Sequence, residues 1–343
     1  MTRTRFAPSP TGSLHVGNAL VAVINRRLGD ELLLRIDDTD ASRNVEGGEA
    51  AIVEDLGWIG LSWDGGPLRQ SDRADRFREA AELLVERGVA WRDDDGAVRA
   101  HDDEGRTLLR ADGSATYVLA SAVDDADFEI THVARGKDLE PTTALQIAII
   151  GALGARAPEF VHHGLILGDD GHKLSKRAPL SSLAALREAG VPGEAVRAYL
   201  EELEVPRGDV HYDLRRIKRL AIDAIESLPD EELAARAGAP LGAVPALRGA
   251  RDLVEARAIA RSLETPAEVA LGADARPTLE RLRELLLANG LDPKSLVREL
   301  KAVGGDLRAV RLALTGQEKG PALWTVLVAL PRDEVLRRVN AAL

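Results

Sequence analysis

Residues 5–18, RFAPSPTGSLHVGN, hold the side chains best suited to phosphate chemistry. Two prolines make a rigid turn, Gly12 and Gly17 let the backbone approach a ligand, and His15 can donate to phosphate oxygens. Free N–H groups at the start of a helix and the helix dipole both favour negative charge. This stretch therefore predicts a phosphate-binding turn, although an ordinary strand, turn and helix with one surface histidine would leave a similar local pattern.

The flanking sequence indicates which elements position this turn. Residues 2–7 alternate weakly and run into the two prolines, so we expect a short strand before the turn. From Val16 up to Gly29, apolar residues recur at three- and four-residue spacing, which predicts a helix. Residues 31–37, ELLLRID, are typical of a buried strand, and the acidic run DDTD follows at the edge where open α/β sheets bind ligands.

A second motif, HKLSKR at residues 172–177, follows an expected last parallel strand at residues 160–167. Lys173 and Lys176 lie on a glycine-bearing loop, from which both could swing onto a triphosphate and neutralise charge as pyrophosphate departs. Such a loop alone could equally be a solvated basic turn. In the same chain as the first turn, it indicates a second phosphate contact.

The composition is that of a globular chain without thiol chemistry. The 343 residues are enough for two or three domains, and 45% hydrophobic with 29% charged residues is typical of a folded protein. Cysteine is absent, which excludes disulfides and cysteine-ligated zinc. The start of the chain lacks an apolar targeting core and the longest apolar run, residues 144–153, is too short to span a bilayer, so we expect a cytoplasmic protein without a membrane segment.

Charge is unevenly distributed along the chain. The net charge of −11 argues against indiscriminate binding of nucleic acid. Residues 211–343 hold 21 Lys and Arg against 19 Asp and Glu, whereas residues 1–210 hold 24 against 37. This difference would suit a carboxyl-terminal half that faces a nucleic acid, but a solvated helical surface would look the same.

Together, the two motifs resemble the signatures of class I aminoacyl-tRNA synthetases, in the form used by the glutamyl and glutaminyl branch. Residues 5–18 resemble the HIGH signature, with an SPTG lead-in specific to the glutamyl side, and HKLSKR resembles the mobile KMSKS loop. The segments RIDDTD, GLSWDGG, RQSDR and LLRADGSATYVLASAVDDADFEITHVARGKD also resemble family segments. The resemblance implies an α/β Rossmann-like catalytic domain followed by an all-α C-terminal region.

The same resemblance implies three domains: a catalytic domain at residues 1–180, a connecting helical region at 181–212 and a helical anticodon-binding-like domain at 213–343. Family members carry a long insertion in the first domain that binds the acceptor stem of tRNA. Only the acidic run RDDDGAVRAHDDEGRT at residues 92–107 occupies its place, and we expect a loop or a short hairpin there. The chain resembles a compact form that lacks most of the insertion.

The resemblance further implies that ATP, which carries its own Mg²⁺, binds between the two motifs. His15 would stabilise the pentacoordinate phosphorus, and Lys173 and Lys176 would hold the departing phosphates. The residues that match ATP-binding positions are Pro8, Ser9, Thr11, Gly12, His15, Gly17, Asn18, Asp138, Leu165, Ile166, Lys173, Ser175 and Lys176. No zinc or other protein-bound metal is expected.

Other residues match positions that contact the amino acid in the family: Arg5, Ala7, Ser9, Asp37, Tyr117, Ser121 and Arg135. An arginine can hold a carboxylate through two hydrogen bonds, which gives Arg5 and Arg135 a physical role, although structural ion pairs would use the same residue type. Three positions depart from the family pattern: Asp37 is one methylene shorter than the usual Glu, Ser121 replaces an amide and Lys137 replaces an acid. Such altered contacts could retune the choice of amino acid.

The implied reaction is activation of glutamate by ATP and transfer to the 3′ end of tRNA(Glu), by a monomeric enzyme. No general base is needed, because the attacking carboxylate is already ionised at neutral pH. Two alternatives remain open. One is a paralogue that adenylates glutamate or a related amino acid for a modified tRNA nucleoside or a small amine, and the other is a non-catalytic tRNA-binding or regulatory protein. The presence of His15, Lys173 and Lys176 favours an enzyme, and the anticodon-like helical tail favours charging of tRNA.

Overall fold

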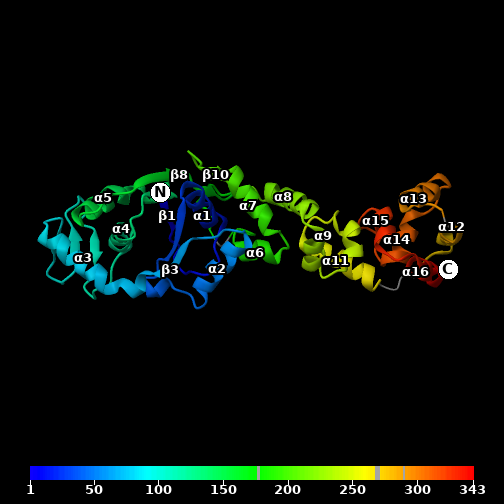
Figure 1. Ribbon diagram of the computed structural model, residues 1–343, viewed down its shortest axis with the longest axis horizontal. Coiled ribbons are helices and arrows are strands. Elements are labelled where there is room, and N and C mark those ends of the chain that lie inside the picture. Colours follow the sequence, from blue (N-terminus) through cyan, green and yellow to red (C-terminus); the bar gives the residue numbers. More distant parts are fainter. Residues whose placement is uncertain (176–177, 267–270, 289) are drawn as a thin grey trace. The chain divides into compact units, whose positions relative to one another are not determined.

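The computed structural model describes residues 1–175, 178–266, 271–288 and 290–343, which form two compact units (Figure 1). The first unit comprises residues 1–186 and 197–214, and the second comprises residues 187–196 and 215–343. The boundaries fall within or at the start of three helices: α6 (Leu183–Glu188), α7 (Gly193–Glu202) and α8 (Leu214–Ser227).

The first unit is built on parallel strands joined by helices. Its parallel strands are β1 (Arg3–Phe6), β2 (Glu31–Ile36), β3 (Gly65–Arg69), β7 (His132–Gly136), β8 (Glu159–His163), β9 (Ile166–Leu167) and β10 (Val210–His211). β1, β2 and β3 pair in that order, with Arg3 opposite Glu31, while β7 pairs with β8 and β9 with β10. The parallel pairs confirm the predicted Rossmann-like architecture.

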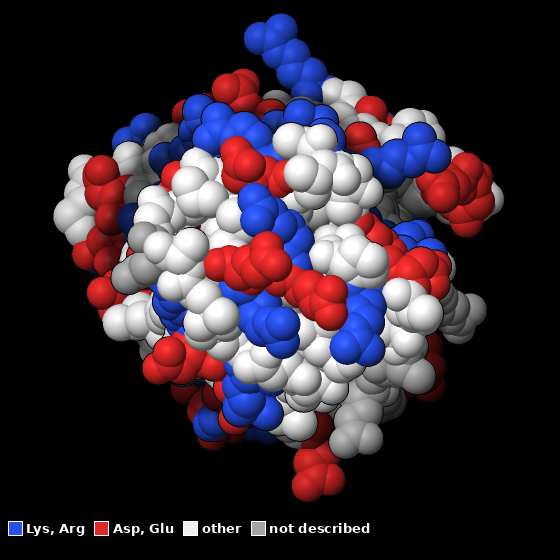
Figure 2. Space-filling model, turned by 90° about the vertical axis from the view of Figure 1, so that its right-hand side faces the viewer, with Lys and Arg blue, Asp and Glu red and all other residues white. Residues whose placement is uncertain are grey.

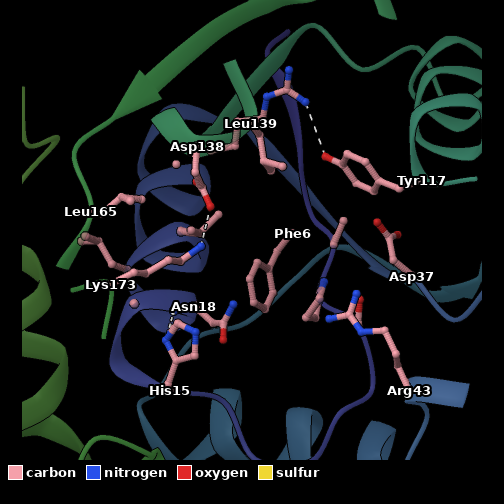
Figure 3. Close-up of a pocket in the computed structure, with 18 of the residues that line it drawn as sticks. Phe6, His15, Asn18, Asp37, Arg43, Tyr117, Asp138, Leu139, Leu165 and Lys173 are labelled. Atoms are coloured by element: carbon pink, nitrogen blue, oxygen red, sulfur yellow. Dashed lines mark hydrogen bonds and ion pairs between the residues drawn. The ribbon is translucent and has the colours of Figure 1, made fainter. Parts of the chain in front are cut away.

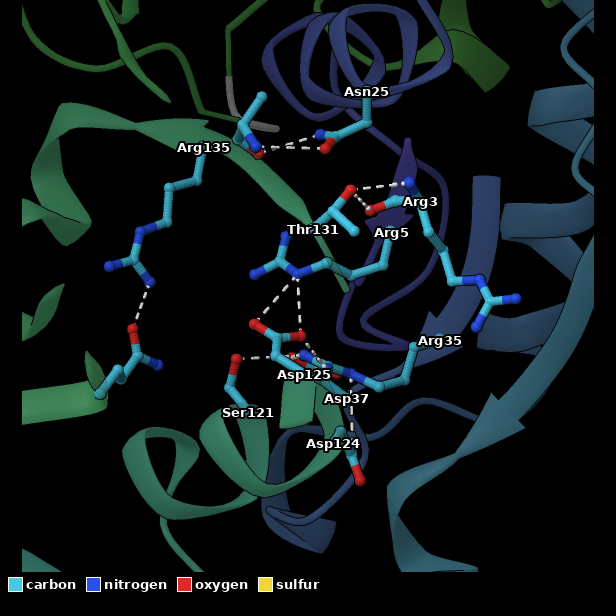
Figure 4. Close-up of polar contacts among 12 residues, drawn as sticks. Arg3, Arg5, Asn25, Arg35, Asp37, Ser121, Asp124, Asp125, Thr131 and Arg135 are labelled. Atoms are coloured by element: carbon cyan, nitrogen blue, oxygen red, sulfur yellow. Dashed lines mark hydrogen bonds and ion pairs between the residues drawn. The ribbon is translucent and has the colours of Figure 1, made fainter. Parts of the chain in front are cut away.

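A buried asparagine on the helix after β1 holds β7, which lies beside β1. Asn25, on the helix after β1, donates to the Ala134 carbonyl at 2.9 Å and accepts the Ala134 N–H at 3.2 Å (Figure 4). Nearby, the Thr131 N–H donates to the Arg3 carbonyl at 2.9 Å. The carboxamide therefore satisfies backbone groups that a strand ladder would otherwise pair.

Helices cover the strands of this unit. They are α1 (Val16–Leu28), α2 (Gly48–Trp58), α3 (Ala74–Glu86), α4 (Tyr117–Asp127) and α5 (Thr143–Ala152), with 3₁₀ turns η1 (Ala41–Arg43), η2 (Gln70–Arg73) and η3 (Lys137–Thr142). α1 confirms the helix predicted after Val16. Its apolar positions, among them Leu20 and Ile24, are buried against the strands.

The acidic run at residues 92–107 belongs to a small antiparallel sheet. β4 (Ala90–Arg92), β5 (Val98–Ala100) and β6 (Thr107–Leu109) form a three-stranded meander. Val98 and Leu108 are fully buried in a cluster with side chains of α3, α4 and α5. The expected short hairpin is present as β4 and β5, and β6 adds a third strand to it. A few apolar residues within the charged run anchor the sheet to the core.

The strand expected at residues 160–167 is two strands in different sheets, so that prediction was wrong. β8 ends at His163, and β9 pairs instead with β10. Gly164 makes this break because its backbone lies against Gly208: a Cβ at Gly164 would lie 1.9 Å from the Gly208 carbonyl oxygen. The Gly164 N–H also donates to the Pro206 carbonyl at 2.7 Å. Both partners are distant in sequence, so the local pattern could not show them.

The second unit consists of helices throughout its described residues, as predicted for the C-terminal region. After α8 they are α9 (Asp230–Ala237), η4 (Leu241–Ala243), α10 (Val244–Leu247), α11 (Leu253–Glu264), η5 (Ala273–Ala275), α12 (Arg276–Ala288), α13 (Pro293–Ala302), α14 (Leu307–Thr315), α15 (Leu323–Ala329) and α16 (Arg332–Ala342). They enclose an apolar core that includes Leu282, Leu300 and Val326. Asp292 and Asp306 cap α13 and α14 by accepting first-turn N–H groups. None of the described helices has the length and apolar character to cross a membrane.

Positive and negative side chains lie close together on the surface of the second unit. Figure 2 shows Lys and Arg interspersed with Asp and Glu on the face seen from the right of Figure 1. Oppositely charged residues of the second unit also pair within single helices, as in Arg276–Glu280, Arg281–Glu284 and Arg337–Glu334. The more balanced charge of this half therefore does not produce an uninterrupted basic surface on that face.

Candidate active site

His15 caps the helix that follows the first strand. It is the N-cap residue of α1, and its Nδ1 accepts the Asn18 N–H at 3.1 Å. Because Nδ1 is an acceptor, the neutral ring carries its proton on Nε2, where it can act as a donor. Gly17 leaves space for the ring: a Cβ there would lie 2.9 Å from the Cε1 and Nδ1 atoms of His15. The predicted phosphate-binding histidine is thus held at a helix N-terminus in a defined tautomer.

Asp55, which the sequence reasoning did not single out, fixes the turn before His15. This carboxylate on α2 is fully buried and accepts the Ser13 hydroxyl and the Leu14 N–H, both at 2.7 Å. The Val16 N–H donates to the Ser181 carbonyl at 2.9 Å. The turn is therefore held from two distant parts of the chain.

A cavity of about 540 Å³ lies at the carboxyl ends of the parallel strands (Figure 3). The predicted site residues that line it are Arg5, Ala7, Pro8, Ser9, His15, Gly17, Asn18, Asp37, Tyr117, Arg135, Asp138, Leu165, Ile166 and Lys173. Thr11, Gly12, Ser121 and Ser175 are not among its lining residues. Lys176 lies outside the described residues. The structure thus places most of the predicted ATP-binding and amino-acid-binding residues, including residues of both motifs, around one cavity.

The loop after β2 adds lining residues that were not predicted. They are Thr39, Asp40, Arg43 and Asn44. Arg110, after β6, and His163, at the end of β8, also line the cavity. Figure 3 shows Arg43 and Asp37 on one side of the cavity, with Lys173 and Asp138 on the other. A signal was present for the first group, because DDTDASRN directly follows the strand end that was expected to bind a ligand.

Lys173 of the second motif pairs with Asp138 inside the cavity. Lys173 Nζ and Asp138 Oδ2 are 2.5 Å apart, and the two side chains are 53% and 35% exposed. Gly136 permits this arrangement, since a Cβ there would lie 2.4 Å from Asp138 Oδ1. An ion pair this exposed is weak, so a triphosphate can compete for the lysine.

Arg135 is a buried cation whose partners, within the described residues, are neutral. Its guanidinium donates to Gln146 Oε1 at 2.6 Å and to Thr143 Oγ1 at 2.7 Å, and more weakly to Tyr117 Oη and His162 Nε2, both at 3.4 Å. Its side chain is 3% exposed, and among the described residues no carboxylate forms an ion pair with it. Burial lowers the pKa of the Arg135 guanidinium, and the nearby charge of Arg5 adds to this effect. A buried arginine that no carboxylate neutralises has hydrogen-bond donors and a charge that suit an anion.

Arg5 is different, although it lines the same cavity. Its Nε donates to both oxygens of Asp125, at 3.0 and 3.3 Å, and both side chains are almost fully buried. Of the two arginines predicted to hold a substrate carboxylate, Arg5 is therefore already neutralised and Arg135 is not.

A second buried network explains two of the positions that depart from the family pattern (Figure 4). Arg35, at the end of β2, donates to Asp37 Oδ1 at 2.7 Å, to Asp125 Oδ1 at 2.9 Å and to Ser121 Oγ at 3.2 Å. Burial raises the pKa of the Asp37 carboxyl, while the charge of Arg35 opposes that shift. Asp37 lines the cavity, whereas Ser121 is fully buried and bonds to Arg35 behind it.

Lys137, the third departure, has a structural partner away from the cavity lining. Its Nζ lies 2.9 Å from Asp209 Oδ2, and Asp209 Oδ1 accepts the Leu165 N–H at 2.8 Å. Asp209 therefore connects Lys137, just after β7, with Leu165, just before β9. It is not a lining residue of the cavity.

Comparison with known families agrees with this geometry. The model of the catalytic domain of tRNA synthetases class I (E and Q) matches residues 1–101 and 96–218. The chain belongs to the class I tRNA synthetases of the E and Q group. A model of an anticodon binding domain matches residues 294–343, in the helical second unit of this synthetase.

Relatives match this class I synthetase along nearly its whole length. It is 35% identical to "Glutamate--tRNA ligase 1" of Rubrobacter xylanophilus, with 99% of this chain and 97% of the relative covered, and 34% identical to "Glutamate--tRNA ligase 2" of Methylobacterium radiotolerans, with both chains fully covered. The first alignment runs over 423 positions, more than the 343 residues of this chain, so that relative carries segments absent here. The β4–β6 meander spans the residues where the family resemblance predicts a shortened insertion.

The fold of the synthetase matches solved structures as well. The crystal structure of a glutamate tRNA ligase from Elizabethkingia meningosepticum in complex with its amino acid superposes with a TM-score of 0.74, at 23% identity, covering 99% of each chain. That likeness establishes the fold.

Proposed function

We propose that this class I synthetase is a glutamate–tRNA ligase. Glutamate and ATP would form glutamyl adenylate and pyrophosphate, and the adenylate would then transfer the glutamyl group to the 3′ end of tRNA(Glu) with release of AMP. The observation that carries the proposal is that one cavity holds both a helix N-terminus capped by His15 and Arg135, a buried cation whose partners in the described part of the chain are all neutral. The names and full-length coverage of the relatives support the same activity.

In the first step, the chain would position the two substrates and stabilise the charge on the phosphates, without forming a covalent bond to either substrate. The glutamate α-carboxylate attacks the α-phosphorus, the bond to the bridging oxygen of pyrophosphate breaks, and pyrophosphate leaves with the Mg²⁺ that ATP carries. The Nε2–H of His15 and the N-terminus of α1 would stabilise charge on the phosphorus oxygens. Lys173 would exchange its bond to Asp138 for the departing phosphates. Lys176 remains assigned to the same task on sequence grounds.

The amino acid would lie with its side chain toward Arg135. Figure 3 shows Tyr117, whose hydroxyl Arg135 contacts, across the cavity from His15 and Lys173. Since the α-carboxylate must reach the phosphate, the carboxylate on the far side is that of the glutamate side chain. Arg135 can hold it through two parallel hydrogen bonds.

The helical region would carry tRNA recognition. We keep the assignments of residues 1–180 to catalysis, 181–212 to a connecting region and 213–343 to anticodon binding, and the matched anticodon-binding model at residues 294–343 supports the last of these. The proposal also places the enzyme in the cytoplasm, where its tRNA substrate is, as a monomer. With the acceptor-stem insertion reduced to the β4–β6 meander, the tRNA 3′ end must reach the cavity without that module.

ATP–pyrophosphate exchange with glutamate, run with and without total tRNA, tests the proposal. Exchange that depends on tRNA, followed by formation of acid-precipitable glutamyl-tRNA, is the expected result. Exchange without tRNA and without charging would favour the paralogue that serves another acceptor. The absence of exchange with any amino acid would refute an activating enzyme.

A further inference from the structure

Gln146 is the closest partner of the uncompensated arginine in the cavity. It is 1% exposed on α5, and its Oε1 accepts Arg135 Nη1 at 2.6 Å. Thr143, one turn earlier on the same helix, accepts from Nη2 at 2.7 Å. Since a guanidinium can only donate, the amide oxygen of Gln146 must face Arg135, and the amide nitrogen must face away.

That orientation leaves an unfavourable group in the protein interior. The Nε2 atom of Gln146 is buried and has no hydrogen-bond partner among the described residues. An unsatisfied buried donor destabilises a fold. A glutamate at this position would have the same shape, would avoid the orphaned donor and would form an ion pair with Arg135. The chain nevertheless has a neutral amide where a carboxylate would satisfy the local structure better.

The other buried arginines of this unit show the contrast. Arg5 and Arg35 both bond to Asp125, and Arg35 bonds to Asp37 as well. The partners of Arg135 on α5, Thr143 and Gln146, are neutral. Burial lowers the pKa of His162, which also contacts Arg135, and the charge of Arg135 lowers it further.

We propose that Gln146 is a positioning residue that determines specificity for an acidic amino acid, because its neutral oxygen orients Arg135 while leaving the positive charge of Arg135 to the substrate carboxylate. The inference rests on the proposed glutamate–tRNA ligase activity. It adds a residue that does not line the cavity, and it explains why the amide tolerates an unpaired donor.

Two variants separate the charge of this position from its packing. Gln146→Glu introduces a resident carboxylate of the same shape, and Gln146→Met removes the acceptor without adding charge. Glutamate-dependent ATP–pyrophosphate exchange is measured with total tRNA present, at varied glutamate and at varied ATP. We expect Gln146→Glu to raise the KM for glutamate about 100-fold or more, because the internal anion competes with the substrate. Gln146→Met should raise it less, about 10-fold, through loss of one hydrogen bond to a charged group.

The KM for ATP and kcat at saturating glutamate should stay near the parent values in both variants. That split separates positioning of Arg135 from general damage to the fold, which would lower kcat and alter both KM values. A KM for glutamate in Gln146→Glu that equals the parent value, or that rises no more than in Gln146→Met, would overturn the inference while leaving the proposed function standing. If the parent itself shows no glutamate-dependent exchange, the proposed function fails and the inference falls with it.

Discussion

Replacing Arg35 by methionine should destabilise the first unit far more than replacing an exposed arginine. Arg35 is 2% exposed and, among the described residues, is the only side chain that hydrogen-bonds to Asp37, which is itself 9% exposed. Asp125 would keep Arg5, and Asp124 would keep Gln70 and Arg73. The variant therefore leaves one buried carboxylate, that of Asp37, without a partner, rather than three. Breaking a buried pair in this way costs about 3–5 kcal/mol.

The assay is urea unfolding followed by tryptophan fluorescence at pH 7.5. Three of the four tryptophans, Trp58, Trp63 and Trp91, belong to the first unit, so the signal reports mainly on the part that contains Arg35. The matched control is Arg69→Met. Arg69 forms an exposed ion pair with Glu49, and its loss should leave the unfolding midpoint nearly unchanged.

The pH dependence and a double variant test the cause. Burial already raises the pKa of Asp37, and loss of Arg35 raises it further, so the folded variant takes up a proton more readily than its unfolded chain. The penalty of Arg35→Met should therefore shrink as pH falls from 7.5 to 5. Adding Asp37→Leu should recover about 1–4 kcal/mol, because no unpaired charge is left buried. A single variant within 1 kcal/mol of the parent, or a double variant no more stable than the single one, would refute the reasoning.

Two further predictions concern histidines. His15→Ala should lower kcat for adenylate formation about 10²–10³-fold with an unchanged unfolding midpoint, as expected for loss of one preorganised donor. Gly17→Ala should also lower kcat without destabilising the fold, because its Cβ would displace the His15 ring from the Asn18 N–H. Wild-type rates in either variant would contradict the assigned position of the ring. Burial lowers the pKa of His163 below 6.5, so the unfolded chain binds more protons just below that pH, and this contribution to stability is lost as pH falls through 6.5. His163→Leu should therefore show a flatter decline of unfolding free energy between pH 7.5 and 5.5 than the parent, and parallel curves would exclude this role.

Features encoded by nearby residues were predictable from the sequence. β1, α1 and β2 follow from alternation, helical spacing and an apolar run, each of which acts over a few residues. The gathering of His15, Asp37 and Lys173 around one cavity follows from two motifs and the rule for strand ends. The break at Gly164 could not be predicted in this way, because its cause lies in the backbone of Gly208.

Support for the site from distant residues was equally invisible in the sequence. Asp55 holds the Ser13 turn from another helix, and no local pattern distinguishes a carboxylate that accepts two buried hydrogen bonds from one on a solvated surface. The same holds for Gln146, whose importance depends on the orientation of Arg135 and on an amide nitrogen left without a partner. Such roles arise from tertiary packing and become visible only when the partners are located.

The three departures from the family pattern bear on substrate choice to different degrees, because they lie at different depths around the cavity. Lys137 pairs with Asp209 and does not line the cavity, so its charge has a structural use. Ser121 bonds to Arg35 behind the lining, where a shorter side chain changes the support rather than the contact surface. Of the three, Asp37 alone lines the cavity and can contact a ligand, and its carboxylate already accepts a hydrogen bond from Arg35. The charge that would select an acidic side chain is that of Arg135, and none of the departures neutralises it. Under the proposed function, the altered positions are therefore compatible with glutamate as the substrate.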